Sequence, residues 1–180
     1  MNIEEKIQQF KKDNSTSMIR TLAVNGGLAP VCTLLVQEDE NFIVVVAPIP
    51  GEALANEKNK KRFLSVMPLF FEGLENKNQK VICFSYSSEA WLRQAPKDSN
   101  LDNWQDLPKV EVLISSYETA DESSIEINNI IRDGKIADEN GQLIDCIRLE
   151  KNKDVEDEES LKNIGGRFST IYKDYINSKN

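Results

Sequence analysis

The chain has 180 residues, of which 39% are hydrophobic and 29% charged, and its formal net charge is −8. This length and composition predict one globular domain that buries a core without disulfides or metal ions, and they exclude a disordered or fibrous protein. The acidic balance opposes direct binding to nucleic acid or to an anionic membrane. The chain has no apolar run of about 18 residues, and its charged N-terminus predicts a helix rather than a signal peptide, so we expect a soluble, cytoplasmic protein.

The sequence contains no histidine. Its absence excludes Ser–His and Cys–His nucleophilic catalysis, His general acid–base catalysis and His-ligated zinc or iron sites. Cys32, Cys83 and Cys146 each lie inside an apolar run and form no CxxC motif, which is typical of buried thiols in a reducing compartment. We therefore expect no cofactor, and the composition favours a protein that is not an enzyme.

In the first third of the chain we predict a helix and a hairpin. Apolar residues recur at helical spacing over Ile3–Val24, and Asn25–Gly27 supplies a stop. The polar run Asn14–Ser17 weakens the middle of this helix, so a break into two shorter helices is the alternative. Pro30–Gln37 and Phe42–Pro48 are β-branched runs separated by a short acidic segment, a pattern typical of a β-hairpin.

A second helix is predicted over Ala53–Leu74, which carries a broad apolar stripe. Pro68 lies inside it and predicts a kink or an end to its first half. Val81–Arg93 is then predicted as a strand that starts in the core and ends in charged residues. Turn residues at Asp133-Gly134 and Asn140-Gly141 separate the pieces that follow. The remaining predicted strands are Val110–Tyr117, Ser124–Arg132, the short Lys135–Ala137 and Gln142–Leu149.

The element order predicts an α+β fold with a mostly antiparallel sheet, built from a hairpin and a meander, and with helices packed on one side. The helix between the hairpin and the next strand allows one parallel pair. We interpret the chain as a single domain, 1–180, with a core of about 30–149. An acidic linker over 150–158 leads into a C-terminal helix over 158–176, whose apolar stripe ends in Ile171 (or Tyr172) and Tyr175.

The second half of Val81–Arg93 is the candidate functional segment. If the strand persists, alternation places Glu89, Trp91 and Arg93 on one face and Ile82, with the other even-numbered residues, on the opposite face. Because Trp and Arg are favoured at interaction hot spots, we predict a binding surface there, to which Trp104 also contributes. Two alternatives stay open. Trp91 covers the sheet edge in a structural role, or Ser88 caps a short helix in which Glu89 and Arg93 form an i,i+4 ion pair.

A resemblance rests on three short motifs: Ser88-Glu89-Ala90-Trp91, Glu111-Val112-Leu113 and Arg132-Asp133-Gly134. Over roughly Pro30–Leu149 the chain resembles a loosely defined set of small, uncharacterised bacterial and phage α+β proteins. This resemblance implies an α+β unit of bacterial or phage origin, and it implies no activity.

Two further charged clusters favour structural interpretations. Acids at Glu118, Asp121 and Glu122, and at Asp138-Glu139, supply oxygen ligands of the kind that Mg²⁺ and Ca²⁺ bind, but acids at strand ends are also what turns require. We therefore predict no metal site. The basic patch at the start of the second helix is interpreted as a solvated face, because cations are unfavourable at a helix N-terminus. It consists of Lys58, Lys60, Lys61 and Arg62.

The leading hypothesis is a non-catalytic interaction or accessory protein that binds an unidentified protein partner through the Trp91/Trp104 region or the terminal helices. One alternative is a carboxylate-dependent hydrolase or small-ligand enzyme that uses Glu89; another is an acidic mimic of nucleic acid. A homodimer formed through a terminal helix or an edge strand is also considered, with Val110–Tyr117 or Pro30–Gln37 as the edge, because unpaired strand edges tend to pair.

Overall fold

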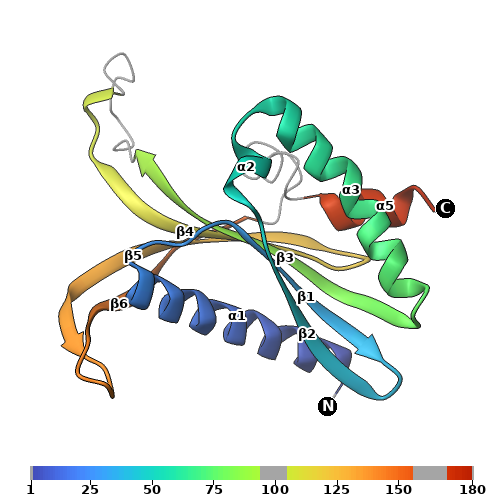
Figure 1. Ribbon diagram of the computed structural model, residues 1–180, viewed down its shortest axis with the longest axis horizontal. Coiled ribbons are helices and arrows are strands. Elements are labelled where there is room, and N and C mark those ends of the chain that lie inside the picture. The colour runs from blue at the N-terminus through green and yellow to red at the C-terminus, as the bar shows by residue number, and fades with distance from the viewer. Residues whose placement is uncertain (1, 94–104, 156–169, 180) are drawn as a thin grey trace.

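The structure is a computed structural model that describes residues 2–93, 105–155 and 170–179. Within these residues the strands form one curled sheet in the order β2-β1-β3-β4-β5-β6, and every neighbouring pair is antiparallel (Figure 1). The strands are β1 (Val31–Glu38), β2 (Asn41–Pro48), β3 (Gln79–Arg93), β4 (Lys109–Glu118), β5 (Ser123–Ala137) and β6 (Leu143–Val155). The helices are α1 (Ile3–Asn25), α2 (Gly51–Leu54), α3 (Glu57–Glu75) and α5 (Ile171–Asn177). The predicted α+β class with an antiparallel sheet is confirmed.

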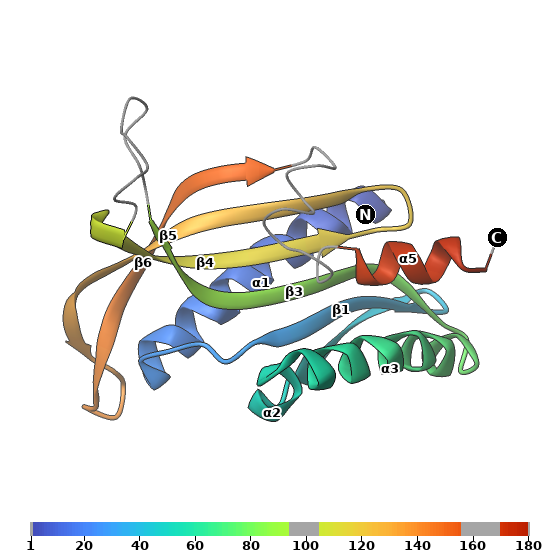
Figure 2. The same ribbon diagram turned by 90° about the horizontal axis from the view of Figure 1, so that it is seen from above.

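Helices cover both faces of this sheet rather than one. α1 lies against one face, and α3 and α5 lie against the other (Figures 1 and 2). Alternation along the strands makes two apolar faces: Leu34 and Phe84 pack in the cluster with α3 and α5, whereas Leu35 and Cys83 pack against α1. The N-terminal helix therefore takes the face that the prediction had left uncovered.

α1 is one continuous helix. Asn2 and Glu5 form a reciprocal capping box at its start, and Gly26 ends it with a left-handed φ of 72°. Asn14 does not interrupt the helix, because its side chain is buried against the sheet and bonds there instead of to the local backbone. The alternative of two shorter helices is therefore wrong.

The predicted hairpin is confirmed as β1 and β2, and the segment that follows it begins differently from the prediction. Asn56 caps a new helix by accepting the N–H of Asn59 at 2.9 Å, so α2 and α3 are separate. Pro68 lies inside α3, which continues to Glu75 without ending there. β3 returns beside β1 in the antiparallel sense, so the described residues contain no parallel pair.

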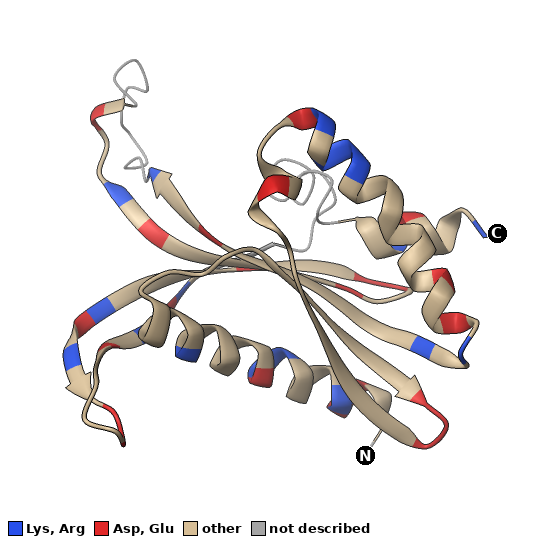
Figure 3. Cartoon of the chain, in the orientation of Figure 1, with Lys and Arg blue, Asp and Glu red and all other residues tan. Residues whose placement is uncertain are grey.

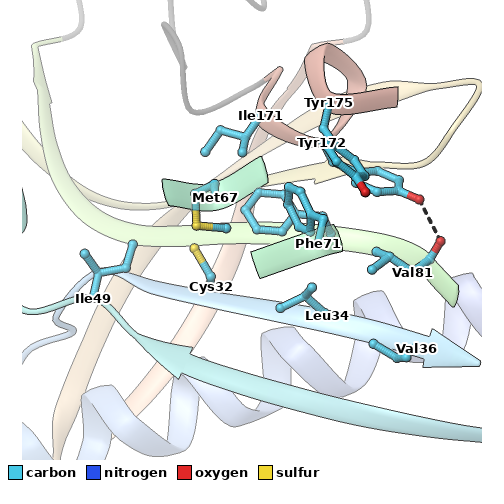
Figure 4. Packing of buried hydrophobic residues seen from close by; sticks show 11 residues of the cluster. Cys32, Leu34, Val36, Ile49, Met67, Phe71, Val81, Ile171, Tyr172 and Tyr175 are labelled. Atoms are coloured by element: carbon cyan, nitrogen blue, oxygen red, sulfur yellow. Dashed lines mark hydrogen bonds between the residues drawn. The ribbon is translucent and has the colours of Figure 1, made fainter. Parts of the chain in front are cut away.

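The core between the sheet and the α3–α5 layer is built around Phe71 (Figure 4). Its ring meets those of Phe84 and Tyr172 edge-on, with centroids 5.6 and 5.2 Å away, and it lies 5.2 Å from the ring of Tyr175. The buried Tyr172 hydroxyl donates to the carbonyl of Val81 at 2.8 Å, which anchors α5 to β3. The predicted stripe of α3 belongs to this cluster: Phe63, Leu64, Met67, Phe70, Phe71 and Leu74.

The end of the sheet differs from the predicted meander in two places. Asp133-Gly134 is an irregularity inside β5 rather than a turn, because Gly134 takes a φ of 102° and the strand resumes at Lys135. β6 continues to Val155, so the first residues of the predicted linker are strand, and the remainder of the linker lies outside the described residues. So does the first half of the predicted C-terminal helix. Its described part is α5, in which Tyr175 is buried as predicted and Ile171 and Tyr172, predicted as alternatives, are both buried.

The cysteines are unpaired thiols. Cys32 and Cys83 are buried and Cys146 is partly exposed. Desolvation by burial raises the pKa of both buried thiols to about 12, so they pack as small hydrophobic groups. In the part of the chain that the structure describes, no helix is both long enough and apolar enough to span a membrane.

Candidate functional site

The candidate segment is a strand throughout. β3 pairs with β4 from Phe84 to Arg93, so the alternative in which Ser88 caps a short helix is wrong. A register shift opposite Leu35 and Val36 leaves Ile82 as an extra residue in β3. For this reason Ile82 packs on the α1 side together with Cys83, not on the opposite face as strict alternation predicts.

The outer half of β3 forms a two-stranded ribbon with β4. β1 pairs with β3 only as far as Ser87, and β4 pairs with β5 only from Val112 onward. Beyond these points the β3–β4 ribbon diverges from the β5–β6 hairpin, and Figure 1 shows the two leaving the sheet in different directions. The edge of β3 from Ser88 to Leu92 has no neighbouring strand among the described residues.

Trp91 lies on this ribbon and is 60% exposed. Its partner across the β3–β4 ladder is Glu111, whose carboxylate forms an ion pair with Arg132. A tryptophan buries a large area when it is covered, so a ring left this exposed on a regular strand is a candidate contact residue. In the structural alternative the ring covers a sheet edge, and that role does not explain why so much of the ring is exposed.

Glu89 has a structural contact. Its Oε2 accepts the backbone N–H of Leu28 at 3.1 Å, which fixes the turn between α1 and β1. The side chain is partly buried and lines neither of the two cavities described below. This position gives no support to the alternative of a carboxylate-dependent enzyme that uses Glu89.

Arg93 also contacts its own chain. Its Nη1 donates to the carbonyl of Leu107 at 2.8 Å and to that of Gln105, so the guanidinium fixes the residues that directly precede β4. Trp104 lies outside the described residues. Of the three predicted binding residues that the structure describes, Trp91 is the most exposed, and Glu89 and Arg93 on either side of it contact their own chain.

Sequence reasoning missed an ionic cluster at the fork between the two ribbons. The guanidinium of Arg132 on β5 binds Glu111 on β4, Asp145 on β6 at 2.8 Å, and the carbonyl of Gly26 at the end of α1 at 3.1 Å. The hydrogen bond that Arg132 donates to Glu111 is the main reason that the pKa of Arg132 is raised above its usual value. These residues are 21, 13 and 106 positions from Arg132, so no local pattern points to the cluster.

Replacing Arg132 with Met is expected to lower the free energy of unfolding by about 1 kcal/mol, because it leaves Glu111 and Asp145 facing each other without a cation. Urea denaturation measures this change. The matched control is Arg148→Met, whose side chain is 53% exposed and pairs with the exposed Asp133. It is expected to leave the urea midpoint close to that of the wild type, because solvent screens this exposed pair. Equal effects in both variants would contradict a special role for Arg132.

A buried polar cluster lies under α1. The Asn14 amide donates to Ser85, Ser87 and the Tyr117 hydroxyl at 3.2–3.4 Å, and Ser87 bonds Ser115 at 2.9 Å. These hydrogen bonds form at one helix position only, so they set the position of α1 along the sheet. The buried Oδ1 of Asn14 has no hydrogen-bond partner among the described residues. The members of the cluster are buried, so we assign the cluster a structural role.

An open cavity of about 380 Å³ lies between the start of α1, the start of β3 and the β4–β5 turn. Its floor is apolar, with Ile7, Ile82 and Tyr117, and the Lys11 ammonium lies over the Tyr117 ring at 5.1 Å. A second hollow of about 400 Å³ separates α3 from α5. In the first of these cavities the Lys11 ammonium also donates to the Ser124 hydroxyl at 3.4 Å.

The predicted acidic clusters do not converge. Asp121 and Glu122 line the open cavity, whereas Glu118 is fully buried on the opposite face. Asp138 accepts the N–H groups of Asn140 and Gln142 at 2.9 and 2.8 Å, which is a turn role. Over residues 2–93, 105–155 and 170–179, no group of three or more acidic or cysteine side chains is placed to hold a metal ion.

Glu118 has a structural role that the sequence did not indicate. Its two carboxylate oxygens accept the backbone N–H groups of Ile171, Tyr172 and Lys173 at 2.9–3.0 Å, which caps α5. Desolvation by burial raises the pKa of Glu118 to about 7 despite these three donors. The carboxyl group is the polar anchor of the C-terminal helix.

Comparison with known proteins gives no match to any family model, curated protein or solved structure.

Proposed function

We propose that this protein is a non-catalytic interaction or accessory protein, of bacterial or phage origin, that binds a protein partner through the outer β3–β4 ribbon at Trp91. The observation that carries the proposal is the 60% exposure of Trp91 between two charged neighbours that are held by contacts within the chain. The ring stands on a strand paired with β4 up to Arg93, so we expect little conformational entropy to be lost when a partner covers it. The bacterial or phage origin rests on the resemblance of the three short motifs alone.

The ribbon also supports a mode of binding. An extended segment of a partner can add to the edge of β3 between Ser88 and Leu92, with main-chain hydrogen bonds for affinity and the Trp91 ring for specificity. Figure 3 shows acidic and basic residues interspersed over the described chain, which does not favour the alternative of a nucleic-acid mimic. The partner expected here is therefore a protein segment with an apolar side chain opposite Trp91.

The test replaces Trp91 with Ala and compares partner capture by crosslinking in extracts of the source cells. We expect the wild-type protein to capture a defined partner in fixed stoichiometry and Trp91→Ala to capture it at least about tenfold less, as for a hot-spot residue. The stability of the variant should change by less than about 0.5 kcal/mol, because the ring is mostly exposed.

The matched control is Leu143→Ala, since Leu143 is 64% exposed on β6, outside the β3–β4 ribbon. Capture by this variant should equal that of the wild type. The absence of any specific partner, or equal capture by Trp91→Ala and wild type, would overturn the proposal.

A further inference from the structure

β2 is an outer strand of the sheet and differs from the other outer strand in its side chains. Phe42–Pro48 carries no charged residue, and Val44 and Val46 are 55% and 57% exposed. In β6, by contrast, Asp145, Arg148, Glu150 and Lys151 interrupt the apolar residues. Charged side chains are how natural proteins protect sheet edges from pairing. The edge of β2 lacks this protection.

The edges expected from sequence were Val110–Tyr117 and Pro30–Gln37, and both expectations are wrong. β4 lies between β3 and β5, and β1 lies between β2 and β3. The order follows from the return of β3 beside β1, which leaves the second strand of the hairpin outside.

The backbone of β2 is arranged for a further strand. The N–H of Ile49 donates to the carbonyl of Pro30 at 3.0 Å, toward β1. Because N–H directions alternate along a strand, those of Phe42, Val44 and Val46 point away from the sheet. Pro48 also falls at an outward position, where its missing N–H costs no bond to β1.

We propose that β2 pairs with β2 of a second copy of this chain across a two-fold axis, to form a continuous twelve-stranded sheet. A strand can pair in this way with the same strand of a second copy. Val44 of each copy then lies opposite Val46 of the other. The four half-exposed valines meet on the α1 side. The inference does not depend on the proposed role of Trp91.

Charge complementarity favours a second copy as the occupant. The turn before β2 is acidic, with Glu38, Asp39 and Glu40 exposed, and the basic cluster at the start of α3 lies at the other end of the strand (Figure 3). Antiparallel pairing brings the acidic turn of each copy toward the basic end of the other, twice. At that end Lys58, Lys60, Lys61 and Arg62 outnumber the two acids Glu52 and Glu57.

The flank of α3 adds apolar surface on the opposite face. Leu64 and Pro68 line the hollow toward α5. Val66 is two residues from each, so it points about 160–200° away from them around the helix, toward the β2 side. Val66 is 50% exposed. In the two-fold pair the Val66 flanks of the two α3 helices face each other, which covers both faces of the new strand pair.

Analytical ultracentrifugation of the purified full chain over roughly 1–100 μM tests the proposal. We expect a species of twice 20.4 kDa. Val44→Lys should raise the dissociation constant at least about tenfold, because it places two ammonium groups near the axis. Leu143→Lys introduces the same change at an equally exposed site on β6 and should leave the dimer intact. Far-UV circular dichroism checks that both variants fold.

A charge exchange tests the two-fold arrangement itself. One variant carries Glu38→Lys and Glu40→Lys, and the other carries Lys61→Glu and Arg62→Glu. Each alone should dissociate more readily than wild type, and an equimolar mixture should recover dimer, because each basic turn then meets an acidic helix start. A monomeric wild-type protein at 100 μM, a dimer insensitive to Val44→Lys, or no recovery on mixing would overturn the proposal.

Discussion

Glu118→Ala is expected to lower the free energy of unfolding by about 3 kcal/mol or more, because it leaves three buried N–H groups at the start of α5 without an acceptor. The same change should release α5 before the rest of the domain unfolds. Urea denaturation measures the first effect, and hydrogen exchange at Tyr172 and Lys173 measures the second. Glu122→Ala is the control, since Glu122 is exposed in the same turn, and it should alter neither quantity.

The pH dependence of stability provides a second measurement on Glu118. Its pKa in the folded protein is about 7, above the ordinary value of 4.5, so the folded state holds the proton more tightly than the unfolded state. The contribution of this group to stability is therefore full below about pH 4.5 and falls as the pH rises toward 7. Glu118→Gln cannot titrate. The wild-type stability, measured relative to that of Glu118→Gln, should decline between pH 5 and 7; a constant or rising difference would contradict the buried carboxyl.

Phe71→Ala is expected to lower the free energy of unfolding by about 4 kcal/mol, as for a fully buried aromatic residue whose removal leaves a cavity. Phe71 joins three elements, because its ring contacts Phe84 on β3 and both tyrosines of α5. Thermal or urea unfolding, with loss of near-ultraviolet circular dichroism at lower denaturant, checks the result.

The matched control lies on the same helix. Leu69 is 64% exposed, so Leu69→Ala also truncates an apolar side chain but creates no cavity. It should change stability by less than about 0.5 kcal/mol. A loss in Leu69→Ala comparable with that in Phe71→Ala would mean that the outer surface of α3 is covered in solution.

The strands and helices were largely predictable because each depends on a local pattern. The apolar stripe of α3 and the β-branched runs of the hairpin carry helical and extended periodicities that hold in the structure. The errors came where a non-local contact overrode the local signal. The polar Asn14 suggested a break in the helix, but its side chain bonds to β3. Gly134 suggested a turn, but it lies at an irregularity within β5.

The candidate site was predictable only in part. Alternation along β3 predicted that Glu89, Trp91 and Arg93 share one face if the strand persists, and the strand does run unbroken past Ser87. That this face is the α1 side was not predicted. Alternation could not show that Glu89 is bound to Leu28, or that Arg93 is bound to Leu107, because those contacts join separate segments. Exposure, which distinguishes Trp91 from its neighbours, is also a property of the folded chain.

By itself, the sequence determined the α+β class, the hairpin, the buried face of α3 and the exclusion of histidine chemistry, because composition and periodicity carry these directly. Tertiary structure alone decided that helices cover both faces, that β2 rather than β1 or β4 is an outer strand, and that Glu118 caps α5. Strand order and the direction of a buried carboxylate depend on pairings between distant residues, and a single sequence does not encode such pairings in any local period.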